Sequence, residues 1–141
     1  MENYFYGDEE KERLREELLD KRAKEWAKSF INPNSDGRDR NPRLTSTQLR
    51  RFHIEAKTLE AKIDALEKPK EEFLKFRPMV KMLKSKVAYA CPIPGRDKKV
   101  PEEFRRYIEE MVDNITDYRD FKAFCLCFEA VVGFFYGEGG R

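Results

Sequence analysis

The stretch LTSTQLRRFHIEAKTLEAKIDAL, residues 44–66, decides the fold class of this chain. Thr45 can cap the start of a helix, and Gln48, three residues later, can return a hydrogen bond to the backbone of the cap. Leu44, just before the cap, is placed to pack on Leu49 as a hydrophobic staple. Apolar residues then recur three and four positions apart, at Leu49, Phe52, Ala56, Leu59, Ile63 and Leu66. This period predicts an amphipathic helix that packs against other helices, and Lys68-Pro69 is expected to end it.

Upstream of this stretch, the sequence predicts one long helix followed by a linker. Apolar residues return to one side of a helix predicted over about residues 8–30: Leu14, Leu18, Ala23, Trp26, Ala27 and Phe30. Asn32-Pro33 is expected to end that helix. Residues 34–43 are polar, rich in turn-forming residues and without apolar periodicity, which is typical of an exposed linker. We therefore expect a loosely docked N-terminal helix within residues 1–33, a linker over residues 34–43, and a helical core domain over residues 44–141.

Downstream, the sequence predicts further helices and no strand. A helical pattern begins near residue 70 but contains Pro78, which lacks an amide donor and clashes with the preceding turn, so we expect a break and a new helix there. Pro101 is expected to open a fourth helix, and Thr116 or Asp117 to cap a fifth. No run alternates with a period of two over the length of a strand. The prediction is an all-α bundle of about five helices with nearly antiparallel packing.

Length and composition agree with one bundle in the cytoplasm. The chain has 141 residues, of which 40% are hydrophobic, 13% aromatic and 40% charged, so a core can form under a heavily ionised surface. No apolar run approaches the roughly 18 residues that a membrane-spanning helix needs. Cys91, Cys125 and Cys127 match no disulfide or zinc framework, and we interpret them as reduced residues in or near the core.

The sequence lacks the parts of a common catalytic centre. His53 is the one histidine, so His-based metal clusters and histidine relays have no partner residues. No glycine-rich phosphate loop precedes a helix. We interpret His53 as a structural residue beside the core, and we expect neither enzymatic activity nor a metal or cofactor.

Positive charge is concentrated in the middle of the chain. Residues 68–99 contain 10 basic residues against 3 acidic ones, although the whole chain carries a formal net charge of only +2. Arg50 and Arg51 fall near the start of a predicted helix, the end whose partial positive charge favours acids. A localised cationic face of this kind can neutralise phosphates without reading bases. The alternative is that these residues form only a solvated surface.

Three stretches of the sequence resemble a known family. They are residues 44–52, residues 83–90, and residues 121–136 with the Gly139-Gly140 tail. In order and spacing, residues 44–140 resemble the small subunit of the type III-A CRISPR effector, the Csm complex. The resemblance implies a helical subunit without nuclease activity, several copies of which stack along a ribonucleoprotein filament in antiviral defence. It also implies that basic residues help to hold the target RNA paired with the guide RNA.

The predicted function is therefore that of a non-catalytic, RNA-binding small subunit of a type III-A ribonucleoprotein complex. The predicted RNA-binding residues are Arg43, Arg50, Arg51, Lys81, Lys84, Lys86 and Arg96. The expected partners are guide RNA and target RNA, the other subunits of the effector complex, and further copies of the chain. In isolation, a homodimer could form if the first helix docks on a second copy. The alternative function is a helical structural adaptor that does not bind nucleic acid directly.

Overall fold

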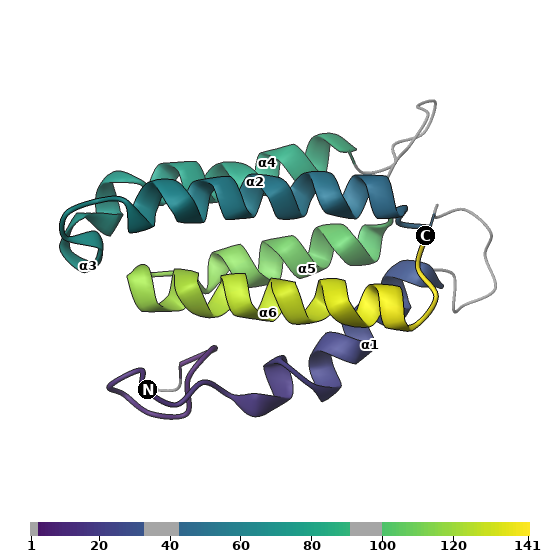
Figure 1. Cartoon of the computed structure of the whole chain (residues 1–141), viewed down its shortest axis with the longest axis horizontal. Coiled ribbons are helices and arrows are strands. Elements are labelled where there is room, and N and C mark those ends of the chain that lie inside the picture. Colours follow the sequence, from purple (N-terminus) through teal and green to yellow (C-terminus); the bar gives the residue numbers. More distant parts are fainter. Residues whose placement is uncertain (1–2, 33–42, 91–99) are drawn as a thin grey trace.

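The computed structural model describes residues 3–32, 43–90 and 100–141, and over these residues the chain is an all-α bundle, as predicted (Figure 1). Its α-helices are α1 (Lys21–Ile31), α2 (Ser46–Asp64), α3 (Pro69–Glu72), α4 (Arg77–Ala90), α5 (Glu102–Asp113) and α6 (Tyr118–Gly137). Two short 3-10 helices, η1 (Glu16–Leu18) and η2 (Phe73–Lys75), precede α1 and α4. Within the described ranges, β pairing is limited to one isolated bridge between Tyr6 and Leu14.

Helix α2 begins with the predicted capping box. The Gln48 amide donates to Thr45 Oγ1 at 3.2 Å, and the Thr45 amide donates to Gln48 Oε1 at 2.9 Å. Leu44 and Leu49, the two residues of the predicted staple, are both buried. The helix ends at Asp64, one turn before Lys68-Pro69.

The predicted break before Pro78 is also confirmed. Helix α3 gives way to η2, and α4 starts afresh at Arg77, so that Pro78 occupies the first turn, where its missing amide leaves no helical hydrogen bond unmade. Asp117, rather than Thr116, caps α6: its Oδ1 accepts the Asp120 amide at 2.9 Å. Pro101 precedes α5 as predicted.

The N-terminal helix predicted over residues 8–30 is wrong for its first half. Helix α1 starts only at Lys21, and the residues before η1 fold back on themselves. The Asp8 carboxylate accepts the backbone amides of Glu12 and Arg13, and Lys11 adopts a left-handed backbone conformation with φ of 57°. An aspartate side chain that bonds nearby amides competes with helical hydrogen bonding, and this explains why the apolar spacing did not produce a helix here.

The sequence suggested that the first helix is loosely docked, and this expectation is wrong. Helix α1 packs on α6 and α5, and it buries Ala23, Ala27, Phe30 and Ile31. Of the predicted linker, residues 34–42 lie outside the described residues.

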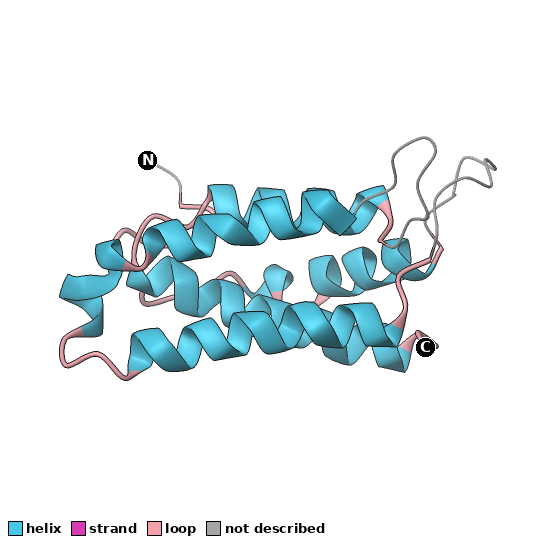
Figure 2. Cartoon of the chain, turned by 90° about the horizontal axis from the view of Figure 1, so that it is seen from above, coloured by secondary structure: helices cyan, strands magenta, loops and turns pink. Residues whose placement is uncertain are grey.

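The helices are arranged in layers (Figure 1, Figure 2). Helices α2 and α4 run side by side in an outer layer, α5 and α6 lie beneath them, and α1 crosses on the far side. Helix α2 packs on α6, whereas α4 packs on α5. The start of α2 and the end of α4 lie at the same end of the bundle.

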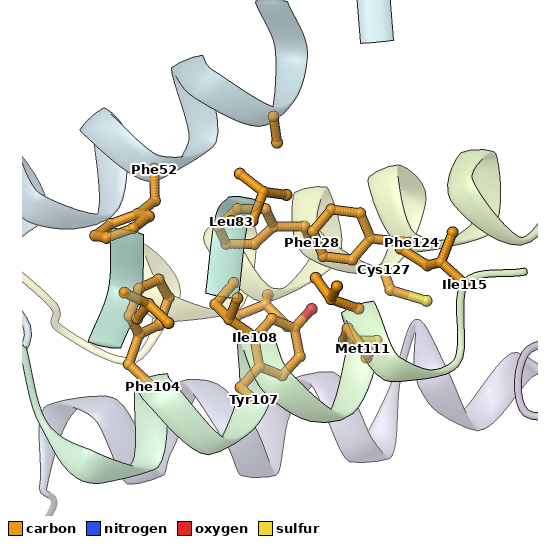
Figure 3. Close-up of a cluster of buried hydrophobic side chains, with 14 of the residues drawn as sticks. Phe52, Leu83, Phe104, Tyr107, Ile108, Met111, Ile115, Phe124, Cys127 and Phe128 are labelled. Carbon is orange, nitrogen blue, oxygen red and sulfur yellow. The ribbon is translucent and has the colours of Figure 1, made fainter. Parts of the chain in front are cut away.

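The core is a chain of aromatic side chains that joins these layers (Figure 3). The ring of Phe104 on α5 lies 5.2 Å from that of Phe30 on α1 and 5.1 Å from that of Phe52 on α2. Phe128 on α6 stacks on Phe124 at 5.7 Å. The two pairs of Phe104 therefore join α5 to α1 on one side and to α2 in the outer layer on the other.

Candidate nucleic-acid interface

Arg50 and Arg51 lie on the exposed surface of α2, directly after its first turn. Two consecutive helical residues point about 100° apart, so Arg51 faces toward α4, on the side of Glu55, while Arg50 faces outward. Within the described ranges, neither guanidinium forms an ion pair or a side-chain hydrogen bond. Both are therefore positioned to meet an anion from solution.

Arg43 has a structural contact of its own. Its Nε donates to the backbone carbonyl of Ile31 at 3.1 Å, which connects the end of α1 with the residues that lead into α2. Its side chain remains exposed near the start of α2. Arg96, the last predicted residue, lies outside the described residues.

The three predicted lysines of α4 do not form one face. Lys86 points toward α2 and pairs with Glu55 at 3.0 Å. Lys84 pairs with Asp113 at the end of α5. Lys81 Nζ lies 3.5 Å from the carbonyl of Val112, also on α5. Lys86 therefore lies on the side of α2 that carries Glu55 and, one helical turn earlier, Arg51. Lys81 and Lys84 face α5 instead.

Two further cations of α2 were missed by the sequence analysis. Lys57 follows Arg50 by seven residues and Lys62 follows Arg51 by eleven, which are spacings that return to the same side of a helix. Both lysines are exposed, and neither forms an ion pair within the part of the chain that the structure describes. The seven-residue spacing from Arg50 is a signal that identifies Lys57 from the sequence, and both lysines lie outside the charge-rich residues 68–99. We call Arg50, Arg51, Lys57 and Lys62 the α2 cations.

The α2 cations differ electrostatically from the lysines of α4. The lysines Lys84 and Lys86 are about one-third to one-half exposed, and each already has a carboxylate partner. Exposed pairs of this kind contribute at most about 1 kcal/mol, so a phosphate could displace the carboxylate. Within the described residues the α2 cations have no carboxylate partner, so they would need no such displacement to meet an anion.

His53 and the cysteines offer little chemistry beside this surface. His53 is half-buried, with its ring 5.4 Å from that of Phe128. Burial, together with the positive charge of Lys57, lowers its pKa below the ordinary value, so the imidazole is neutral at pH 7. Burial raises the pKa of the Cys125 thiol and raises that of Cys127 to about 12, so both are protonated and unreactive. Cys91 lies outside the described residues.

Two other kinds of feature are absent from the described ranges. No group of three or more histidine, cysteine, aspartate or glutamate side chains is arranged to hold a metal ion. None of the helices combines the length and the apolar character that crossing a membrane requires.

Comparison with known proteins gives one result. The family model described as Csm2 Type III-A matches residues 13–140. The match reaches beyond the region of resemblance noted in the sequence and takes in η1 and α1. No curated protein and no solved structure matches the chain.

Proposed function

Because the chain belongs to the Csm2 Type III-A family, and is thus a subunit of a type III-A CRISPR effector complex, we propose that it is the small subunit that binds RNA without cleaving it. Membership of the family implies association with the other subunits of the Csm complex. The finer proposal is that the chain contacts the phosphate backbone of guide and target RNA in the cytoplasm. In this proposal it contributes binding, while other subunits supply any catalysis.

The observation that carries the proposal is the set of α2 cations. Four exposed cations on one helix, without carboxylate partners in the described part of the chain, release bound counterions when they meet phosphates. Arginine is suited to this because its planar guanidinium can donate two hydrogen bonds to one phosphate. The contacts would fix the position of the RNA without reading its sequence.

The other predicted residues have a secondary place in the proposal. Arg43 and Lys86 lie near the same end of the bundle as Arg50 and Arg51, and can extend the phosphate path. Lys81 and Lys84 face α5, so they would contact only a second RNA strand or another segment of the same RNA. Arg96 stays in the proposal on sequence alone.

RNA binding as a function of salt concentration tests the proposal. The Arg50→Ala/Arg51→Ala variant should bind RNA roughly tenfold more weakly, because two exposed charge contacts are lost at up to about 1 kcal/mol each. The slope of log K against log salt should also fall by about 0.7 to 0.9 for each phosphate contact removed. The measurement is made on the assembled effector complex, where the RNA is held by several subunits.

The matched control removes the same charge elsewhere. Lys24→Ala/Lys28→Ala changes two exposed lysines of α1, on the far side of the bundle, which lie 4.0 and 3.9 Å from Glu138. This variant should bind RNA as the wild type does. Equal effects from both variants, or no effect from the arginine variant when it remains folded, would remove Arg50 and Arg51 from the interface.

The proposed lack of catalysis has its own test. Labelled RNA incubated with the purified chain and a divalent metal should stay intact. Cleavage products that disappear when a side chain of this subunit is changed would overturn that part of the proposal.

The adaptor function remains the alternative, and the ion pairs of Lys84 and Lys86 favour it, because they neutralise two of the predicted cations. An adaptor would assemble normally in the complex, yet no variant of the α2 cations would alter RNA affinity or its salt dependence.

A homodimer of the isolated chain is a separate proposal. Exchange of α1 between copies would reproduce its packing on α5 and α6. Light scattering should then show a species of twice 16.8 kDa at high concentration. A single 16.8 kDa species would end this proposal.

A further inference from the structure

Four large apolar side chains are exposed together on the outer layer of the bundle. They are Ile54 on α2, Leu74 on η2, and Met79 and Met82 on α4, with exposed fractions of 54%, 65%, 50% and 50%. Ile54, Met79 and Met82 line one groove between α2 and α4, and Met82 also lines an open hollow with Leu74 and Pro78. A contiguous apolar surface of this kind on a charged protein indicates an interaction site.

The surface has the shape of a shallow track along α4. Helices α2 and α4 pack mainly on α6 and α5, and side chains of both helices line a groove between them that is partly open to solvent. The groove has a volume of about 200 Å³, less than the roughly 300–1,000 Å³ of a small-molecule site, and the wide-open hollow beside it has about 650 Å³, so the groove itself suits inserted side chains. Within α4, from Arg77 to Lys86, the track measures about 13.5 Å at 1.5 Å per residue, which is about two and a half turns of a docked helix.

The charges beside the track are mainly positive. Arg77 and Lys81 line the hollow on one side, and Lys62 and Lys86 line the groove on the other. Glu55 is the one carboxylate among these lining residues, and it is paired with Lys86. A partner with acidic residues beside its apolar positions would therefore be complementary to both edges of the track.

From this apolar track and its cationic edges, we infer that the outer layer docks an acidic amphipathic helix of another protein subunit. Apolar side chains of that helix, three and four positions apart, contact Met79, Met82 and Ile54, while its carboxylates meet Arg77. Methionine side chains adapt to the shape of a partner, which suits this role. None of the residues that line the groove and the hollow is aromatic, whereas sites that bind single-stranded RNA stack bases on aromatic rings, so protein is the favoured occupant. The inference stands on the apolar surface and holds whether or not the α2 cations bind RNA.

Site-specific photo-crosslinking in the reconstituted effector complex tests the inference. A photoreactive phenylalanine derivative in place of Met82 should form a crosslink to one segment of another subunit. That segment should have apolar residues at helical spacing with Asp or Glu beside them. The same probe in place of Leu126, which is also 50% exposed but lies on α6, should not crosslink to that segment.

A pair of serine variants gives the quantitative test. Met79→Ser/Met82→Ser should weaken incorporation of the chain into the complex by about tenfold or more, since central apolar contacts dominate such interfaces. Leu126→Ser should incorporate as the wild type does. The salt dependence of RNA binding per incorporated subunit should not change in either variant, which separates this test from that of the α2 cations.

Several outcomes would overturn the inference. They are a crosslink from position 82 to RNA, to a second copy of the chain, or to a segment with basic flanks, and the absence of any protein crosslink there. Normal incorporation of the Met79→Ser/Met82→Ser variant would overturn it as well. Thermal unfolding of each variant confirms that the fold is intact, as expected for substitutions at half-exposed positions.

Discussion

Tyr107 shows at the scale of one residue how tightly the core is closed. Its side chain is fully buried among Trp26, Phe30 and Phe128. The hydroxyl has no hydrogen-bond partner within the described residues. Burial raises the pKa of Tyr107 well above its ordinary value, so the group stays protonated. The ring stabilises the core by packing, while the unpaired hydroxyl destabilises it because burial removes its hydrogen bonds to water.

Removal of that hydroxyl should not destabilise the protein. We expect Tyr107→Phe to raise the free energy of unfolding by about 1 kcal/mol, because the desolvation penalty of an unpaired polar group disappears while the ring remains. Chemical denaturation of the two proteins measures the difference. A loss of more than 1 kcal/mol would mean that the hydroxyl is hydrogen-bonded after all, for instance to an internal water.

Lys11 is a second residue whose role depends on its charge. Its ammonium lies 2.7 Å from the Asp117 carboxylate and 3.1 Å from that of Asp120, which is buried and also accepts hydrogen bonds from Thr116. Partial burial would raise the pKa of Asp117, but the hydrogen bond from Lys11 and nearby backbone amides outweigh it, so the pKa lies below its ordinary value. Burial would lower the pKa of Lys11, but the two carboxylates raise it on balance.

These pKa shifts predict how stability depends on pH. A carboxyl with a lowered pKa stabilises the fold above about pH 4, the pKa of an unfolded aspartate, and this contribution is lost as the pH falls. Lys11→Met should therefore lower the free energy of unfolding by about 1–2 kcal/mol at pH 7, a modest amount because Asp117 is half exposed. The difference from the wild type should shrink as the pH falls through 4 toward 2. Denaturation at several pH values checks this, and a difference that stays constant down to pH 2 would contradict it.

At the scale of elements, contacts at the ends of the helices determine where each helix begins and ends. The end of α6 is held by Gly139, which has a φ of +96°, and by Gly140, whose amide donates to the Phe135 carbonyl at 2.8 Å. A Cβ at Gly140 would overlap the ring of Phe135, which is fully buried and cannot move away. The final carbonyl, on Arg141, accepts the Ser46 amide at 2.7 Å, so this end of α6 also supports the start of α2.

Two alanine substitutions near this end should have opposite effects. Gly140→Ala should cost about 1–3 kcal/mol because of overlap with the Phe135 ring. Gly137→Ala, in the last turn of α6 with open space around its Cβ position, should be neutral or stabilise by up to about 1 kcal/mol. Thermal unfolding of the two variants side by side provides the measurement. Equal stabilities would show that the tail does not pack on α6 as described.

At the scale of the whole molecule, the N-terminal segment is part of the bundle. Phe5 is fully buried, Tyr6 donates to the Arg119 carbonyl at 2.8 Å, and Arg119 donates to the Lys11 carbonyl at 2.8 Å. Residues from opposite ends of the sequence thus close the core around the start of α6. The family match begins at residue 13, so most of this segment lies outside it.

Phe5→Ala should therefore act as a core substitution. We expect a loss of about 3 kcal/mol or more in the free energy of unfolding, which is typical of deleting a buried phenylalanine ring. Leu74→Ala, at an exposed position, should change it by less than about 0.5 kcal/mol in the isolated chain. A loss below 1 kcal/mol for Phe5→Ala would show that the segment does not belong to the core.

The sequence by itself determined the helices whose signals are local. The Thr45 capping box and the new helix at Pro78 each depend on residues within one turn, so they could be predicted without knowing what packs against them. For the start of α6 the sequence left Thr116 and Asp117 as alternatives, and the structure shows Asp117. The exposure of Arg50 and Arg51 followed in the same way from the apolar period of α2.

Only the tertiary structure decided the features that depend on a distant neighbour. Burial of Phe5 and the contacts of Lys11 with α6 hold the N-terminal segment in a non-helical form, although its apolar spacing suits a helix. The lysines of α4 divide between Glu55 and Asp113 because α2 and α5 flank opposite sides of that helix. Helical period fixes which residues share a side, but only packing fixes which side meets solvent, a carboxylate or the core.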